Sequence, residues 1–393
     1  MYRYRHQPSK AIYLTGQFLV TLLRIPLWIL VSIPRSWRPR KSWSFKRAFL
    51  LKVARFVMVL PSETGPLIKS PNHEAITLGP GINGLWVEPV PDLITGKLSV
   101  WKDDNSVMPV RIPGYWTHKK GYDIKVGAAP TSGEKVLYHL HGGGYIRLSA
   151  HPSDPTAAIA RGILQHTESF HRVFALEYRL SSAAPFVIDA PFPAALLDAL
   201  AGYNYLVNVV GFSPADIIIA GDSAGGNLTQ ALTRYLVEYQ GFDKLPAPPG
   251  GIILLSPWSD LGVSHDSPTG SSDVFLNSDY IDCSRGGINY AKKAYLGKMT
   301  LSPSLIPRNP YICPASLDPD LVIDFKGFPR TFLVAGGAEV LYDQIITLRD
   351  RMAKDLGDQF TYYEAKDAFH DYLIFEWHEP ERTETLKAIA KWV

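Results

Sequence analysis

A serine in a Gly-x-Ser-x-Gly pattern, within Gly221–Gly226, constrains the fold of this chain more than any other feature. A strand-like apolar run, residues 216–220, comes directly before it, and a run without proline or glycine, residues 227–240, follows. The glycines permit a sharp, strained turn that lifts the Ser223 hydroxyl above a sheet edge, with a helix N-terminus beneath it. The pattern predicts a nucleophile elbow, although small-residue turns between strands and helices are common.

Strand-like and helix-like segments alternate around this stretch, which indicates a mostly parallel sheet covered by helices on both faces. Strands are expected at residues 135–140, 172–178, 251–255, 330–334 and 360–364, and helices at 155–165, 192–208, 343–356 and 380–392. Residues 56–130 carry shorter strand-like runs, at 85–87 and 124–126, which we interpret as the first strands of the sheet. The expected fold class is therefore α/β.

The composition limits the classes of protein to which this chain can belong. The chain has 393 residues, of which 46% are apolar, so it can form one large α/β domain with insertions, or two domains. Its formal net charge of +3 is too small to indicate a nucleic-acid partner. Cys283 and Cys313 belong to no Cys/His cluster, so neither a structural metal site nor a disulfide framework is expected, and two free, buried thiols are favoured.

The amino-terminal part of the chain is apolar over residues 11–33 and then basic, with interleaved tryptophans, over residues 35–47. As a helix, the apolar stretch would be about 34 Å long, enough to cross a bilayer core. Arg24 and Pro26 lie in its middle, so a single span, a helix in the membrane plane and a soluble helix packed on the main domain all stay open. We expect residues 11–47 to associate with the membrane of the endoplasmic reticulum. The side of the membrane on which the main domain lies stays open, because both flanks of the apolar stretch are basic.

A serine hydroxyl needs a base within hydrogen-bond reach and a third group that orients the base. The loop after the last expected strand offers His370 as the base. The turn after the strand at 330–334 offers Glu339, and Asp343 follows at the start of the next helix. Because an aspartate at a helix start often has only a capping role, Glu339 is preferred as the acid and Asp343 is the second choice. The order serine, acid, histidine is the one expected of an α/β hydrolase.

Three consecutive glycines follow His141, directly after the strand expected at 135–140. Such a run costs backbone entropy, and its use is to let backbone N–H groups approach a reacting atom closely. Gly143 and Gly144, together with the N–H of Ala224, are therefore the expected donors of an oxyanion hole. His141 precedes this loop, and we expect it to fix the loop by hydrogen bonding rather than to act as the base.

These residues resemble the hormone-sensitive-lipase-like branch of the α/β hydrolases. The resemblance covers roughly residues 135–393, and its motifs are His-Gly-Gly-Gly-Tyr at 141–145, Gly-Asp-Ser-Ala-Gly-Gly-Asn at 221–227, and shorter matches at 178–180, 192–195, Asp198 and the His370 loop. It implies an α/β-hydrolase fold with Ser223 as nucleophile, His370 as base and the oxyanion donors named above. The chain departs from the family pattern at three places. Glu339 stands where Asp is usual, and Asp371 stands where Gly usually follows the histidine. Residues 181–185 read Ser-Ser-Ala-Ala-Pro where the family has Ala-Pro-Glu.

The basic, tryptophan-bearing amino-terminal segment and residues 377–382 also resemble fungal membrane-associated members of this branch. These include sterol-acetate deacetylases and esterases of secondary-metabolite pathways. In the family, the amino-terminal region and an insertion after the sheet form a cap over the active site. Because Lys and Arg are in excess over the first 55 residues, we expect a membrane-associated segment and basic linker at 1–55 and a catalytic domain at 56–393. The irregular stretch 261–328, helix-like near 288–296, is expected to contribute to the cap together with the amino-terminal part.

The expected function is a serine carboxylic-ester hydrolase for a lipophilic small-molecule ester, acting through an acyl-enzyme without a metal or an organic cofactor. Acyl transfer, elimination or cyclisation on the same site is one alternative. A ligand-binding receptor on this fold is another, although such proteins often lack the nucleophile or the base, and this chain has Ser223, His370 and a carboxylate.

Overall fold

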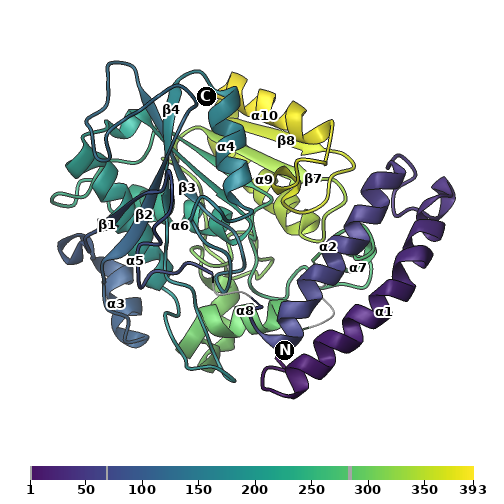
Figure 1. The fold of residues 1–393 in the computed structure, drawn as a ribbon. Coiled ribbons are helices and arrows are strands. Elements are labelled where there is room, and N and C mark those ends of the chain that lie inside the picture. Colours follow the sequence, from purple (N-terminus) through teal and green to yellow (C-terminus); the bar gives the residue numbers. More distant parts are fainter. Residues whose placement is uncertain (1, 68–69, 282–285) are drawn as a thin grey trace.

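The computed structural model describes residues 2–67, 70–281 and 286–393, and in this part of the chain the centre of the fold is one eight-stranded sheet (Figure 1). The strands lie in the order β1-β2-β4-β3-β5-β6-β7-β8. β2 pairs antiparallel with β1 and β4, and every later pair is parallel. The expected α/β class is thus confirmed. The strands are β1 (Asn83–Val87), β2 (Ile112–His118), β3 (Lys135–Leu140), β4 (Phe170–Leu176), β5 (Ile217–Asp222), β6 (Gly251–Leu255), β7 (Thr331–Gly336) and β8 (Phe360–Ala365).

Helices cover both faces of the sheet, because successive side chains of a buried strand point to opposite faces. In β5, Ile217 and Ile219 enter one core, whereas Ile218 and Ala220 enter the other. The first core packs against α5 (Ala194–Asn204), α6 (Ala224–Glu238) and α9 (Tyr342–Leu356), and the second against α4 (Ala157–His166) and α10 (Glu381–Trp392).

Two helices precede the sheet, α1 (Ser9–Ser32) and α2 (Phe45–Thr64), and they lie side by side along one flank of the molecule (Figure 1). The apolar side chains of α1 face outwards, as Leu23 does at 78% exposed, and Arg24 donates a hydrogen bond to Gln17 in the same helix at 3.2 Å. α1 is long and apolar enough to cross a membrane by length and composition. A soluble helix that buries its apolar side on the main domain is not observed.

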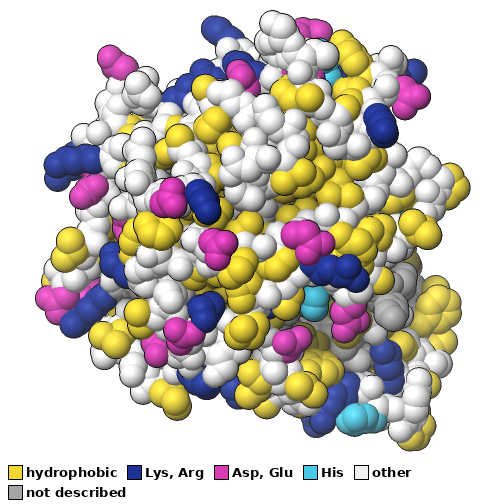
Figure 2. Space-filling view, turned by 90° about the vertical axis from the view of Figure 1, so that its left-hand side faces the viewer, with side chains coloured by type: hydrophobic (Ala, Val, Ile, Leu, Met, Phe, Trp, Pro, Cys, Tyr) yellow, Lys and Arg dark blue, Asp and Glu magenta, His cyan; other side chains and the backbone are white. Residues whose placement is uncertain are grey.

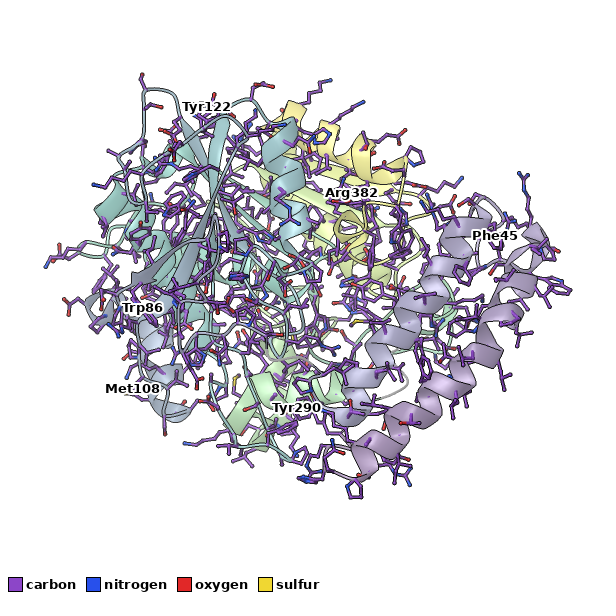
Figure 3. The ribbon with its side chains drawn as sticks, in the orientation of Figure 1. Phe45, Trp86, Met108, Tyr122, Tyr290 and Arg382 are labelled. Carbon is purple, nitrogen blue, oxygen red and sulfur yellow. The ribbon has the colours of Figure 1, made fainter. Side chains whose placement is uncertain are left out.

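The amino terminus and the insertion meet at one end of the sheet. The insertion contains α7 (Ser271–Val274) and α8 (Gly287–Leu296), the latter at the position expected for its helical piece. Figure 3 shows Tyr290 of α8 close to the start of the chain, where its ring lies 5.0 Å from the ring of Tyr2 in an edge-to-face contact. The Tyr2 N–H also donates to the carbonyl of Ser62 near the end of α2. These contacts place α2 and α8 next to each other.

The structure differs in part from the expected organisation of the chain. The expected boundary at residue 55 falls inside α2, which is continuous and buries Leu51 in the second core. Residues 124–126 form no strand and lie in a loop between two glycines with positive φ, Gly121 and Gly127. The helices α2, α3 (Gly96–Asp104) and α7 and the strand β2 were not among the expected elements.

The surface near the antiparallel edge of the sheet carries charges of both signs. Figure 2 shows basic and acidic side chains interspersed among hydrophobic ones on this face. This mixture agrees with the small net charge of the chain, +3.

Candidate active site

Ser223 stands between β5 and α6 with φ 52° and ψ −117°, a conformation that residues other than glycine rarely adopt. The turn requires small neighbours, because a Cβ on Gly225 would lie 2.0 Å from the carbonyl oxygen of Leu140, and one on Gly221 would lie 2.1 Å from that of Gly225. The Ser223 N–H donates to the Leu255 carbonyl at 2.9 Å, which ties the turn to β6. The structure therefore has the strand–turn–helix geometry that the motif predicts.

The glycine loop meets this turn because β3 and β5 are parallel neighbours, so their carboxyl ends lie at the same sheet edge. The Gly142 N–H donates to Oδ2 of Asp222 at 3.0 Å and joins the loop to the elbow. Gly143 and Gly144 have φ of +106° and +63°, and both line the cavity that contains Ser223. Ala224, the third expected oxyanion donor, is the first residue of α6 and follows Ser223 directly.

His141 lies below the glycine loop and is fully buried. Its Nδ1 lies 2.7 Å from the Gly142 carbonyl oxygen, and its ring stacks on that of Tyr178 with centroids 4.3 Å apart. Burial lowers the pKa of His141 to about 4, so its imidazole is neutral at pH 7. These contacts agree with the expected role of fixing the loop.

The structure brings His370 and Glu339 together. Glu339 lies in the turn after β7 and His370 in the loop after β8, and both side chains are buried. Nδ1 of His370 lies 2.9 Å from Oε2 of Glu339, while Oε1 of Glu339 accepts the Gly336 N–H at 2.8 Å. Because the carboxylate is held by the backbone of its own turn, it fixes the orientation of the imidazole.

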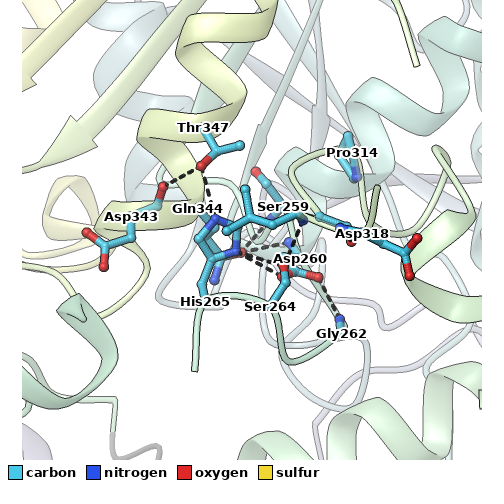
Figure 4. Close-up of polar contacts among 12 residues, drawn as sticks. Ser259, Asp260, Gly262, Ser264, His265, Pro314, Asp318, Asp343, Gln344 and Thr347 are labelled. Carbon is cyan, nitrogen blue, oxygen red and sulfur yellow. Dashed lines mark hydrogen bonds and ion pairs between the residues drawn. The ribbon is translucent and has the colours of Figure 1, made fainter. Parts of the chain in front are cut away.

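Asp343, the second choice for the acid, makes its hydrogen bonds elsewhere. Its Oδ2 accepts the Ser271 N–H at 2.8 Å, and its own N–H donates to the Ser271 hydroxyl at 3.0 Å. Figure 4 shows its carboxylate directed away from the polar cluster around His265, while its carbonyl oxygen accepts from the Thr347 hydroxyl. Asp343 therefore joins α9 to the start of α7, and the structure does not bring it to His370.

Asp371 is the site residue whose contact the sequence did not reveal. Its Oδ2 lies 3.0 Å from Nε2 of His370, the ring nitrogen opposite Glu339. No hydrogen bond joins Ser223 to His370 within the described residues. The only signal in the sequence was the departure from the glycine that usually follows the family's histidine.

The two carboxylates and the imidazole perturb one another. Burial lowers the pKa of His370, but the charge and hydrogen bond of Asp371, followed by those of Glu339, outweigh burial and hold it well above the ordinary value. Burial raises the pKa of Asp371 to about 7, against the opposing charge of His370 and with a further increase from Asp222. The contact of Asp371 with Nε2 therefore favours a proton on the imidazole of His370.

A cavity of about 130 Å³ opens above Ser223. It is bounded by the elbow, the glycine loop and the His370 loop on the sheet side, and by α2 and the insertion on the other. The side chains from these last two elements are mostly apolar: Met58, Val59, Ser62, Tyr280, Ile281, Ile288 and Ala291. The parts expected to form a cap thus both line the cavity.

Within the described residues, no group of three or more His, Cys, Asp or Glu side chains could hold a metal ion. Cys313 is a buried free thiol, and burial raises its pKa. Cys283 lies outside the described residues.

The pattern of the alpha/beta hydrolase fold family matches residues 137–374. The chain belongs to this family. This α/β hydrolase is 27% identical over 290 residues to an esterase from Acinetobacter venetianus, an alignment that covers 72% of this chain and 80% of that protein. It is 30% identical over 255 residues to an acetyl-hydrolase from Streptomyces hygroscopicus, covering 65% of this chain and 73% of that protein.

The fold is also that of solved hydrolases. The crystal structure of a hormone-sensitive lipase from a metagenome library matches with a TM-score of 0.56 at 23% identity, over 95% of this chain and 96% of that one. The expected α/β-hydrolase fold is therefore confirmed, and the match over residues 137–374 confirms the α/β-hydrolase family.

Proposed function

We propose that this α/β hydrolase cleaves carboxylic esters through Ser223. The observation that carries the proposal is one cavity that holds the elbow serine, Gly143, Gly144 and an imidazole bound to the Glu339 carboxylate. Relatives named esterase and acetyl-hydrolase support ester chemistry.

The mechanism assigns one role to each group. The Ser223 oxygen attacks the ester carbonyl while Nε2 of His370 takes its proton, and Glu339 orients the imidazole and stabilises its positive charge. The N–H groups of Gly143, Gly144 and Ala224 bind the developing oxyanion, and each such donor is typically worth about 10² to 10³ in rate. The acyl-enzyme is then cleaved by water, which His370 activates.

The substrate we propose is a lipophilic ester, such as an acyl ester of a sterol or a secondary metabolite. The apolar cap side chains support an apolar substrate, because burying apolar surface is the main source of affinity in such a cavity. The exposed apolar surface of α1 supports delivery from a membrane, with residues 11–47 as the associating segment. The resemblance to membrane-associated deacetylases motivates the endoplasmic reticulum as the location.

Ser223→Ala tests the proposed chemistry. The purified variant should lose hydrolysis of short-chain p-nitrophenyl esters while keeping the wild-type circular dichroism spectrum. Hydrolysis that continues undiminished would show that Ser223 is not the nucleophile.

Deletion of residues 1–40 tests the membrane association. The full-length chain should sediment with membranes after cell fractionation, and the truncated chain should stay in the supernatant. If the full-length chain is already in the supernatant, the association is wrong.

A further inference from the structure

The carboxylate of Asp371 contacts Nε2 of His370, the ring nitrogen that the proposed mechanism requires as the base. Oδ2 lies 3.0 Å from Nε2, while Glu339 takes the other nitrogen. The backbone of Asp371 is left-handed, with φ 47°, and its N–H donates to the Ser256 hydroxyl at 3.4 Å. This backbone conformation holds the carboxylate against the base, so Asp371 competes with Ser223 for Nε2.

The second carboxylate oxygen of Asp371, Oδ1, has no hydrogen-bond partner among the described residues. The residue is only 5% exposed, yet it lines the cavity together with Ser223. A buried carboxylate oxygen without a donor is costly, and such a group in a folded protein calls for a partner. Because Asp371 borders the cavity, a substrate that enters the cavity is the expected source of this donor.

The groups around Asp371 indicate what kind of donor fits. Asp222 at the end of β5 and Glu339 after β7 are acids, which cannot donate when ionised and which raise the pKa of Asp371. Tyr280 of the insertion lines the same cavity, and so does Arg147 after β3, which forms no ion pair within the described residues. The side chains of the cap are mostly apolar, which disfavours a charged substrate group in this cavity, so a neutral hydroxyl is favoured as the donor.

We propose that Asp371 accepts a hydrogen bond from a free hydroxyl on the alcohol part of the substrate, and that this contact frees His370 Nε2 for Ser223. The hydroxyl lies next to the scissile ester, because Nε2 also returns its proton to the departing alcohol oxygen and Asp371 is adjacent to Nε2. The substrate class is therefore monoacyl esters of vicinal diols or polyols. This inference rests on the proposed esterase function and narrows it.

The proton count is consistent with this role. In the free enzyme one proton lies between Oδ2 and Nε2. It leaves to solvent when the carboxylate of Asp371 turns from the imidazole to the substrate hydroxyl. Asp371 stays a carboxylate and forms no covalent bond. Nε2 then accepts the Ser223 proton as the serine oxygen bonds to the ester carbon, and it passes this proton to the departing diol.

The experiment compares three butyrate esters that differ beside the ester oxygen. They are 2-hydroxyethyl butyrate, its methyl ether 2-methoxyethyl butyrate, and butyrylcholine, which carries a quaternary ammonium. For the wild type, kcat/KM should be about ten- to hundredfold higher for the hydroxyl ester than for the ether, the ratio expected of one hydrogen bond to a charged group.

Asp371→Gly is the decisive variant, because glycine adopts the left-handed backbone at this position without strain. It should bring the hydroxyl-to-ether ratio close to one, raise kcat/KM for the ether, and label faster than the wild type with an alkyl fluorophosphonate that lacks a hydroxyl. Asp371→Asn, which keeps the shape, should also lower the ratio. Asp367→Asn, in the same loop and partly exposed, is the matched control and should keep the wild-type ratio.

A wild-type ratio near one, a ratio that persists in Asp371→Gly, or a preference for butyrylcholine would each overturn the inference while leaving the esterase function intact. If the wild type hydrolyses none of the three esters or p-nitrophenyl butyrate, the proposed function is wrong and the inference falls with it.

Discussion

Replacing Glu339 with Gln removes one buried negative charge and keeps the side-chain volume. Glu339 uses both oxygens, because Oε2 faces Nδ1 of His370 at 2.9 Å and Oε1 accepts the Gly336 N–H at 2.8 Å. A glutamine amide has one oxygen and one NH2 group, so it cannot accept at both positions. Either the turn loses a hydrogen bond or the imidazole loses its acceptor, and in both cases the imidazolium formed during the reaction loses its counter-charge.

We expect kcat/KM for p-nitrophenyl butyrate to fall about 10³- to 10⁴-fold in Glu339→Gln, as when the acid of a serine triad loses its charge. This loss corresponds to about 4–5.5 kcal/mol of transition-state stabilisation. Asp343→Asn is the comparison, because Asp343 binds the backbone of Ser271 instead, and it should keep a rate close to wild type. The reasoning is refuted if Asp343→Asn loses the activity and Glu339→Gln retains it, with both variants folded by circular dichroism.

Three further predictions concern pH and stability. Burial lowers the pKa of His370 and the charge of Asp371 raises it, so the imidazole of Asp371→Asn should lose its proton at lower pH. The ascending limb of the pH profile of kcat/KM should therefore move to lower pH in this variant, and an unchanged limb would contradict this. Asp198→Ala leaves the buried Arg179 guanidinium without its carboxylate, 2.8 Å away in the wild type, and should lower the free energy of unfolding in urea by about 3–5 kcal/mol. Gly225→Ala places a Cβ 2.0 Å from a backbone oxygen of β3, and the soluble, folded fraction after expression should fall sharply.

The centre of the fold could be predicted because its strands are buried on both faces and read as short apolar runs bounded by turn residues. The strand β2 at the antiparallel edge of the sheet could not be predicted. β2 contains Pro113 and Gly114, which argue against a strand, and it forms because β1 and β4 pair with it on both sides. The run at 124–126 has strand-like residues but no neighbouring strand, and the loop glycines around it decide its conformation.

The site also has a part that could be predicted from the sequence and a part that could not. Ser223, His370 and Glu339 follow expected strands, and parallel strands bring their carboxyl ends to one edge, so chain order alone predicts that these residues meet. The contact between Asp371 and Nε2 depends on one backbone dihedral and one side-chain direction, which no residue spacing encodes. Likewise, the choice between Glu339 and Asp343 depended on where α7 packs, since Ser271 at its start binds Asp343.

The most direct test of the central claim is covalent labelling of the purified protein with an alkyl fluorophosphonate, followed by intact mass measurement and peptide mapping. We predict one adduct per chain, on Ser223, with loss of hydrolysis of p-nitrophenyl butyrate in proportion to labelling and no adduct in Ser223→Ala. Full hydrolysis after complete labelling, or an adduct on another residue that alone abolishes activity, would contradict it.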